Sequence, residues 1–521
     1  MKLSHCLISL SLLVACQQNA PLPIVDTQPV THAKFNGFNG RAEALKTAGV
    51  RLFGKNDPTV AQDLEPEYIA VSADSKTAWV TLQENNALAV LDIPSGTIRE
   101  IVPLGYKDHS LTGKGMDVSD TDKTIKIQKV KVKGMYQPDA IASFQVAGKT
   151  YLVTANEGDA REWGDFKEET SVSKLALDPA NFTADDTAAL ARLNVTSTLG
   201  QKDGKYSTLY AFGARSISIW NAEGKQVSDT GDTIEQQVAL KHAANFNANH
   251  TSNTIDNRSD NKGAEPEGVT TAEIAGKTFA FVGLERQGGI MTFDVSDPTR
   301  PVFVDHTNNR DFNEDLKNFA GTSDLGPEGV LFIPAADSPN GENLLVVGNE
   351  VSGSTTAYTV SDAGKLTLKG RHIFTENGKS VLDKGAAEIV AYDKASKRLF
   401  VVNGYSKTID VLDFKDPGKP SALKQWALDT YGESANSVAV RGGLVAVAVQ
   451  AKVKTDAGKV VFFDAEGNLK GQATVGALPD MLTFTPDGKY VLVANEAEPS
   501  DDYTVDPEGS ISIVNVQKTL Q

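Results

Sequence analysis

One short unit recurs along this chain: a proline, an acidic residue, and an alternating apolar run of the kind that forms a β-strand. Clear copies occupy residues 65–71, 137–141, 265–269, 326–330 and 478–482, and weaker ones begin at Ala387 and Asn436. Each copy is followed by a turn and two more strand-like runs rich in Val, Ile, Phe and Thr. A unit of three short strands cannot cover its own apolar face, so the copies must pack against one another.

Seven such units predict an all-β fold, a seven-bladed β-propeller with long inter-strand insertions. The last copy ends with its third strand near Val516, so we expect the segment between residues 33 and 53 to supply the missing outer strand and close the ring. The alternative is two smaller β-domains, but the copies run from Glu65 onward without a linker. We therefore assign residues 33–521 to one propeller.

Three long polar segments interrupt the repeat, at residues 105–135, 158–205 and 243–263. Such segments are either solvated excursions or lids that face a ligand. The acidic stretch 498–502 has the same two interpretations. Helical patterning is scarce, apart from a short helix expected near residues 183–193.

The N-terminus has the features of an export signal. Lys2 precedes an apolar stretch over residues 3–14, which is too short to span a membrane as a helix. The stretch runs into Leu13-Val14-Ala15-Cys16, which resembles the lipobox of bacterial lipoproteins. We expect residues 1–16 to be a leader whose Cys16 is acylated and anchors the protein to a membrane, rather than an ordinary signal peptide with a chance cysteine.

Two further expectations follow from this segment. Gln17, rather than Asp, follows the cysteine, which predicts an outer-membrane lipoprotein of the cell envelope, on its periplasmic or surface face. Residues 17–32, with three prolines, are expected to form a flexible tether. Cys6 is the only other cysteine, so the mature domain has no internal disulfide, thiol nucleophile or Cys-ligated zinc.

The charge balance restricts the partners. The chain carries 51 Lys and Arg against 67 Asp and Glu, a formal net charge of -16, which disfavours nucleic acid because phosphate backbones require clustered cations. An acidic surface fits either simple solubility or the collection of divalent cations.

In an antiparallel blade, the loop before strand one and the loop after strand two lie on the same side of the sheet. Acids occupy both positions in most copies. Because clustered carboxylates repel one another, they predict a hard divalent cation, Ca²⁺ or else Mg²⁺. The alternative is that each acid accepts backbone N–H bonds and latches adjacent blades. The predicted metal ligands are Glu67, Asp139, Glu157, Asp159, Glu267, Glu328, Glu388, Asp480 and Glu496.

Arg161, Arg286 and Arg258 lie in the same loops, where they would either pair with these acids or hold the phosphate of an anionic ligand. No serine-hydrolase elbow, Walker loop or zincin motif is present. The enzymatic hypothesis is a metal-dependent phosphomonoesterase, in which Arg161 or Arg286 stabilises the transferring phosphoryl group. The alternative is a non-catalytic envelope scaffold that binds a protein, a glycan or a mineral surface.

Three segments together, residues 156–162, 258–269 and 325–330, resemble the choice-of-anchor I family, and the resemblance extends from about Phe35 onward. It implies a propeller and an extracytoplasmic location. The family includes surface proteins with varied anchors, relatives linked to biomineralisation, and atypical alkaline phosphatases. The resemblance carries no established set of catalytic residues.

Overall fold

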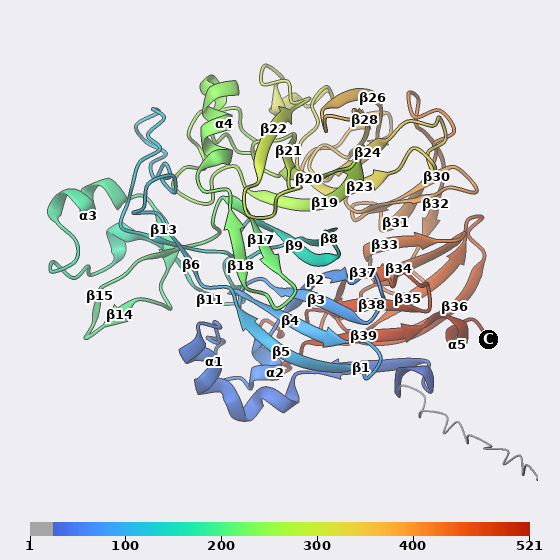
Figure 1. Ribbon diagram of the computed structural model, residues 1–521, viewed down its shortest axis with the longest axis horizontal. Coiled ribbons are helices and arrows are strands. Elements are labelled where there is room, and N and C mark those ends of the chain that lie inside the picture. The colour runs from blue at the N-terminus through green and yellow to red at the C-terminus, as the bar shows by residue number, and fades with distance from the viewer. Residues whose placement is uncertain (1–23) are drawn as a thin grey trace, which may run out of the picture.

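The computed structural model describes residues 24–521 (Figure 1). The predicted leader, its Cys16 that we expect to be acylated, and the first part of the predicted tether lie outside the described residues. Within residues 24–521 the chain forms seven four-stranded antiparallel sheets, together with short ribbons and helices. No helix in this part of the chain is both long and apolar enough to cross a bilayer.

Six of the sheets are built from strands in the order innermost to outermost. The first two sheets contain β2 (Pro66–Val71), β3 (Thr77–Leu82), β4 (Ala87–Asp92) and β5 (Thr97–Pro103), and then β8 (Ile141–Val146), β9 (Lys149–Asn156), β17 (Ser216–Asn221) and β18 (Gln226–Asp229). The third and fourth contain β19 (Pro266–Ile274), β20 (Lys277–Leu284), β21 (Ile290–Asp294) and β22 (Val302–Thr307), and then β23 (Pro327–Ile333), β24 (Leu344–Asn349), β25 (Ser354–Val360) and β26 (Leu366–Ile373). The fifth and sixth contain β29 (Val390–Asp393), β30 (Arg398–Asn403), β31 (Thr408–Asp413) and β32 (Ser421–Ala427), and then β33 (Ala435–Arg441), β34 (Leu444–Val449), β35 (Ala457–Asp464) and β36 (Leu469–Ala477).

The seventh sheet joins the two ends of the described chain. It contains β37 (Pro479–Phe484), β38 (Tyr490–Asn495), β39 (Ser510–Asn515) and, as the outer strand, β1 (Val30–Lys34). Val30 lies opposite Val514 and Lys34 opposite Ser510. Closure by an N-terminal strand is therefore confirmed, although the strand begins before residue 33.

The start of this strand corrects the predicted tether. Residues 24–32 form η1 (Ile24–Asp26) and most of β1, so they belong to the propeller and not to a flexible segment. The physical reason is alternation, which places the apolar side chains of Val30 and Ala33 against the cores on the two faces of the seventh sheet.

The innermost strands contact one another around a ring, in the order β2, β8, β19, β23, β29, β33, β37 and back to β2. In Figure 1 the labels of β2, β8, β19, β23, β33 and β37 surround the centre of the molecule. The apolar cores lie between neighbouring sheets: Phe144 and Ile217 of one sheet, for example, are buried with Ala280 and Met291 of the next. The predicted all-β propeller is confirmed, and the alternative of two separate β-domains is not what the ring shows.

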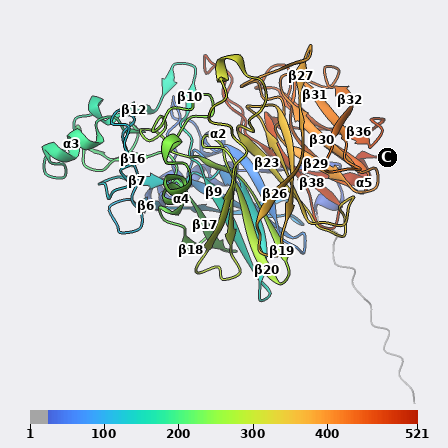
Figure 2. The ribbon, with the colours of Figure 1, turned by 90° about the horizontal axis from the view of Figure 1, so that it is seen from above.

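The first two insertions form a lobe beside the ring (Figures 1 and 2). We call this region the insertion lobe and define it as residues 105–135 and 158–211. It has its own apolar core, in which Met116, Phe182 and Leu193 are buried, so these segments are not merely solvated excursions. The lobe contains β6 (Tyr106–Asp108), β7 (Lys133–Met135), β10 (Glu162–Trp163), β11 (Phe166–Lys167), β12 (Glu169–Ser171), η3 (Val172–Lys174), α3 (Ala184–Leu190), β13 (Asn194–Thr196), β14 (Gln201–Lys202), β15 (Lys205–Tyr206) and β16 (Tyr210–Ala211).

The expected helix near residues 183–193 is confirmed as α3, where Thr183 accepts a hydrogen bond from the backbone of Asp186. The remaining short elements connect or cap the blades. They are η2 (Asn36–Arg41), α1 (Ala42–Ala48), α2 (Val60–Asp63), α4 (Thr233–Lys241), η4 (Ala243–Asn245), η5 (Leu316–Asn318), β27 (Thr375–Glu376), β28 (Lys379–Ser380) and α5 (Val516–Thr519).

Candidate functional site

A β-bulge follows the proline in most copies of the repeat. In β2, Pro66 lies opposite Leu82 and the next pair joins Ile69 to Val80, so Glu67 and Tyr68 together oppose a single residue. The same irregularity follows Pro266, Pro327 and Pro479. A bulge re-aims the side chain at the start of a strand. Here it places an acid of each such blade on the inner strand, at one end of the ring.

Each blade contributes one residue to the wall of the central cavity, from the bulge position or from the equivalent position of its innermost strand. In six blades this residue is an acid, and in the seventh it is Asn436. Five of these residues line a cavity of about 100 Å³ together with Asn436, and the sixth acid, Glu388, lies beside it. We call the six acids the inner ring. They are Glu67, Asp139, Glu267, Glu328, Glu388 and Asp480. All six were predicted as metal ligands, and the structure brings them to one mouth of the propeller.

Three inner-ring acids lack hydrogen-bond partners. One carboxylate oxygen each of Glu67, Glu267 and Glu328 is buried, with no donor to it among the described residues. An unpartnered buried carboxylate oxygen is unfavourable, because water has been removed and nothing has replaced it. The interpretation of these acids as latches that accept backbone N–H bonds therefore does not fit these three oxygens.

Glycines allow the blades to bring these acids together. Gly268 directly follows Glu267, and a Cβ atom there would overlap the backbone carbonyl oxygen of Glu328 in the next blade. Gly329 follows Glu328, and a Cβ atom at that position would lie 2.6 Å from the carbonyl oxygen of Glu388. Only glycine permits this close approach between neighbouring inner strands.

Burial and mutual repulsion raise the pKa values of the inner ring. Burial, followed by the carboxylates of Glu285 and Glu157, raises the pKa of Glu267 well above its ordinary value. Burial, followed by Glu388, does the same to the pKa of Glu328. Burial raises the pKa of Asp480 to about 7. The cavity therefore favours protons or a cation over bare negative charge.

A second set of acids lies at the same mouth, in the loops directly after the second strand of four blades. We call it the outer ring: Glu157, Glu285, Glu350 and Glu496. Oxygens of Asp139, Glu157 and Glu267 lie within 4.8 Å of one another, so the two rings are contiguous. Asp159 is exposed at the rim, where its charge adds to burial in raising the pKa values of Glu157 and Glu496. All the predicted metal ligands therefore lie at this mouth.

Unlike the inner ring, the outer ring has basic side chains next to it. We call the outer ring together with Glu265, Arg258, Lys262 and Arg286 the outer layer. Lys262 Nζ lies 2.6 Å from Glu157 Oε1 and 2.9 Å from Glu265 Oε2. Arg258 Nη2 lies 2.5 Å from Glu265 Oε1, and Arg286 Nε lies 3.2 Å from Glu265 Oε2. Burial alone would raise the pKa of Glu265, but these three cations outweigh it and hold that pKa well below its usual range. Glu265 is thus the centre of an ion-pair network.

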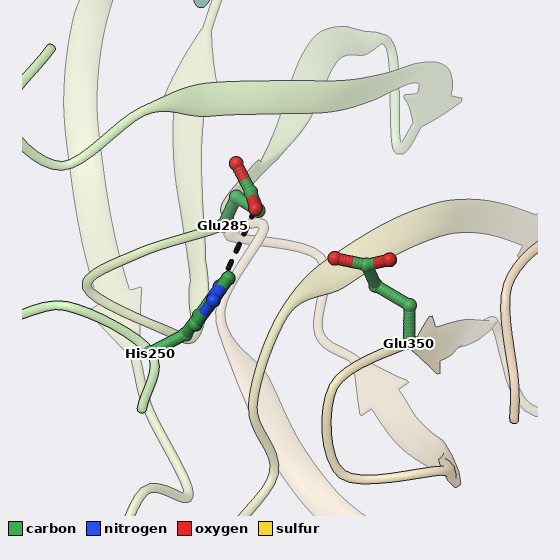
Figure 3. Close-up of side chains that lie close together, drawn as sticks. All are labelled: His250, Glu285 and Glu350. Carbon is green, nitrogen blue, oxygen red and sulfur yellow. Dashed lines mark ion pairs between the residues drawn. The ribbon is translucent and has the colours of Figure 1, made fainter. Parts of the chain in front are cut away.

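Figure 3 shows the neighbouring group of His250, Glu285 and Glu350, which come from three different loops. His250 Nδ1 lies 3.4 Å from Glu285 Oε1, and Arg286 Nη1 lies 2.8 Å from the same ring nitrogen. Burial, followed by the charge of Arg286, lowers the pKa of His250 to about 3, so its imidazole is neutral. Burial also raises the pKa values of Glu285 and Glu350 to about 8.

Sequence reasoning missed His250, Lys262 and the role of Glu265. The available signal was weak: Lys262 precedes Glu265 by three residues, and His250 is one polar residue in a polar insertion. Their partners come from other blades, which no local pattern identifies.

The structure corrects the role predicted for Arg161. Its side chain is fully buried, forms ion pairs with Asp63 and Glu65, and stacks 4.4 Å from the ring centroids of Phe53 and Trp163. These contacts join the insertion lobe to the first blade. Because the Arg161 guanidinium is already paired with two carboxylates, it is not free to hold a phosphate. Arg286 differs, because its side chain at the mouth remains 22% exposed.

Comparison with known proteins finds one matching family model and two curated relatives. The choice-of-anchor I domain matches residues 13–298 and 388–520, which is most of the chain. Gigasin-3a of Magallana gigas is 26% identical over 190 residues, covering 33% of this chain and 65% of that protein. The mesenchyme-specific cell surface glycoprotein of Strongylocentrotus purpuratus is 28% identical over 388 residues, covering 64% of this chain and 49% of that protein. The chain thus spans less than two thirds of the length of these curated relatives.

Among solved structures, the β-propeller domain of Myceliophteria thermophila Cps50 (Swd1) is 9% identical, with 87% of this chain and 96% of that chain covered and a TM-score of 0.42. A putative 6-phosphogluconolactonase from Bacteroides fragilis is 15% identical, with 84% and 90% covered and a TM-score of 0.39. The fold assignment rests on the strand pairing and ring contacts described above.

Proposed function

This chain belongs to the choice-of-anchor I family, and from that premise we propose that it is a cell-envelope propeller that binds a divalent cation, Ca²⁺, at its carboxylate-lined mouth. The ligands are drawn from the inner ring and from Glu157, Asp159 and Glu496 at the outer ring and the rim. The cation neutralises charges that the protein itself leaves unmatched.

One observation carries the proposal: three buried carboxylate oxygens, on Glu67, Glu267 and Glu328, have no donor and surround a cavity of about 100 Å³. Within residues 24–521 no lysine or arginine forms an ion pair with an inner-ring acid, since Lys262 and Arg286 pair with outer-layer carboxylates. A cavity of roughly 10–15 Å³ on this measure is enough to hold one water, so this cavity has room for an ion with part of its hydration shell.

The donor set supports calcium. The cavity offers carboxylate oxygens of the inner ring and the amide of Asn436, and no cysteine or histidine lines it. Met481, which also lines it, offers only a weakly accepting thioether sulfur. Hard oxygen ligands select Ca²⁺ or Mg²⁺, and Ca²⁺ accepts more ligands in less regular geometry than Mg²⁺ does. Acids contributed by different blades would give a cation ligands in irregular geometry, which Ca²⁺ accepts.

The test is calorimetric titration of CaCl₂ into purified protein that has been treated with EDTA. We expect wild-type protein to bind calcium, and the double variant Glu267→Gln, Glu328→Gln to lose at least about 100-fold in affinity, since each lost carboxylate weakens a charged site by an order of magnitude. Glu43→Gln is the matched control, because its side chain is 90% exposed in α1. Equal calcium affinity in the double variant and the wild type would refute the site.

A second candidate function is metal-dependent phosphomonoester hydrolysis, in which Glu157, Asp159, Glu267 and Glu328 hold the metal that activates water. The observation that favours it is the partly exposed Arg286 guanidinium, which lies beside Glu285 and could bind a phosphoryl oxygen. Hydrolysis of p-nitrophenyl phosphate that requires calcium and is lost in both Glu267→Gln and Arg286→Lys would support it. Calcium binding without turnover would leave a scaffold that holds an anionic ligand, protein, glycan or mineral surface.

The membrane anchor is a separate proposal. We propose that Cys16 is acylated and attaches the propeller to the outer membrane, because the lipobox-like segment ends at that residue. Membrane fractionation should place the wild type with outer-membrane lipids and Cys16→Ser in the soluble fraction. Mass spectrometry of the mature N-terminus checks the modification, and an unmodified Cys16 would refute it.

A further inference from the structure

We propose that His250, Glu285 and Glu350 form a second metal site, which binds zinc or a similar first-row divalent cation rather than calcium (Figure 3). One ligand atom of each residue lies within 4.8 Å of the ligand atoms of the other two. We call these three residues the histidine site. It shares no residue with the calcium ligands proposed above and does not depend on them.

Packed backbone positions the three ligands. Glu285 and Glu350 are equivalent residues of neighbouring blades, each directly after the second strand, β20 or β24. The backbone N–H of Glu285 donates to the carbonyl oxygen of Glu265 at 2.8 Å, and that of Glu350 donates to the carbonyl oxygen of Gly326 at 2.8 Å. His250 comes from the last of the three polar insertions and is only 7% exposed. Ligands held at the ends of strands are placed more precisely than ligands on free loops.

The protein itself satisfies the two carboxylates poorly. Glu285 is 5% exposed, and within residues 24–521 its carboxylate forms ion pairs only with Arg286 Nη2, at 3.1 Å, and with His250 Nδ1, at 3.4 Å. In the same part of the chain Glu350 forms no ion pair, and no group donates a hydrogen bond to either carboxylate. Carboxylates removed from water without donors are unfavourable unless a cation or a proton satisfies them.

Arg286 supplies the nearest positive charge, but its fit is imperfect. Its Nη1 lies 2.8 Å from Nδ1 and 2.7 Å from Nε2 of His250. The imidazole is neutral, so one ring nitrogen carries a hydrogen and only the other can accept a hydrogen bond. One of the two short contacts therefore brings two N–H groups together. A metal ion would replace the guanidinium between His250 and Glu285, while Arg286 keeps its ion pair with Glu265.

The donor atoms identify the class of metal. An imidazole nitrogen with two carboxylate oxygens suits zinc and other first-row divalent metals, whereas calcium and magnesium take oxygen ligands. Among the groups of metal-ligating side chains that lie this close together in residues 24–521, this is the only one that contains a histidine. Ligand atoms of a tetrahedral zinc ion lie about 3.3 Å apart, so small shifts of three side chains would complete the site.

Zinc titration tests the site. The experiment is calorimetric titration of ZnCl₂ into the whole protein, treated with EDTA and then dialysed into buffer with excess CaCl₂. We expect the wild type to bind one equivalent of zinc and His250→Gln to bind it at least about 100-fold more weakly, since loss of even a residue that supports a metal ligand costs 10–100-fold. His372→Gln, at a histidine of β26 outside this group, is the matched control. Equal zinc affinity in His250→Gln and the wild type, or no zinc binding by the wild type, overturns the proposal.

Substitution of Arg286 separates a metal site from a simple ion-pair network. Because the guanidinium and the metal would compete for the same ligands, Arg286→Gln should bind zinc at least about tenfold more tightly than the wild type does. The same calorimetric titration measures the change. Zinc binding that is unchanged or weaker in Arg286→Gln would overturn the placement of the metal between His250 and Glu285.

Cobalt spectroscopy gives a direct readout of coordination. Co²⁺ bound in place of zinc should give visible absorption bands with the wild type and not with His250→Gln. If His250→Gln does not fold, Glu350→Gln provides the same comparison, because its carboxylate has no partner to lose. The double variant Glu267→Gln, Glu328→Gln should retain both the bands and the zinc equivalent, so the two sites fail independently. Loss of zinc in that double variant would place the metal among the calcium ligands and overturn the proposal.

Discussion

Two glutamates separated by a single proline, Glu265 and Glu267, have opposite environments. Glu265 is fully buried and contacts Lys262, Arg258 and Arg286. Glu267 lines the cavity, and one of its oxygens has no donor. The comparison separates the two interpretations of the acidic repeat: in this blade the residue before the proline is the structural latch, and the residue after it is available for a ligand.

The bulge explains the difference. Proline has no N–H and fixes the start of β19, and the two residues after it lie opposite a single residue of β20. The side chain of Glu267 is therefore directed to the inside of the ring, whereas Glu265 lies in the connecting loop among the basic residues of the 243–263 insertion. The four predictions below test this contrast, from the largest expected effect to the smallest.

Glu265→Gln should destabilise the protein by about 3–5 kcal/mol, because it leaves buried cations without their counter-charge. Urea unfolding in EDTA measures the loss, and Glu267→Gln, two residues further along the chain, is the matched comparison. Glu267→Gln should show no loss, since it removes a charge that has no partner. A Glu265→Gln protein as stable as Glu267→Gln would refute the latch.

Glu328→Gln should lower the affinity for calcium by at least about tenfold, which corresponds to 1.4 kcal/mol. Its stability in EDTA should be unchanged or higher, because repulsion from Glu388 is relieved. Calorimetric titration and unfolding of the same samples check both statements. Weaker calcium binding accompanied by an equal loss of metal-free stability would instead indicate a structural role.

The metal-free protein should lose stability as the pH rises from 5 to 8. Burial, followed by Glu350, raises the pKa of Glu388 to about 8, and burial raises that of Asp480 to about 7. Between their unfolded and folded pKa values the folded state holds more protons, so raising the pH favours unfolding. Urea unfolding at several pH values measures this, and calcium should flatten the profile. Stability that rises over this range in EDTA would contradict the assigned charges.

Asn436→Asp should have the smallest effect, about 0.5–1 kcal/mol of destabilisation in EDTA, because one hydrogen-bond donor is replaced by a charge. Asn436 Nδ2 donates to the carbonyl oxygen of Pro479 at 3.0 Å, and this bond would be lost. The substitution gives the inner ring a seventh acid, so calcium should restore stability. Thermal unfolding with and without calcium tests this, and a loss that calcium does not reduce would place Asn436 outside the cation site.

Much of the fold and part of the site could be predicted from local patterns. Alternating apolar runs identified the inner strands, and the acids after proline, such as Glu67 and Glu328, were identified as residues of one mouth. The patterns did not reveal that Arg161 would form ion pairs with Asp63 and Glu65, because those contacts join an insertion to the first blade. They also did not separate Glu265 from Glu267, since both are acids next to the proline at which β19 begins.

By itself the sequence determined the repeat, the alternation of each strand and the acid at its start, because these depend on neighbouring residues. Only the tertiary structure decided which carboxylates pair with a lysine or an arginine. Lys262 reaches Glu157 across 105 residues of chain, and Arg161 reaches Glu65 across 96. Such pairs exist only after the ring has closed and the insertions have packed beside it, because closure sets the distances on which electrostatic and hydrogen-bond energies depend.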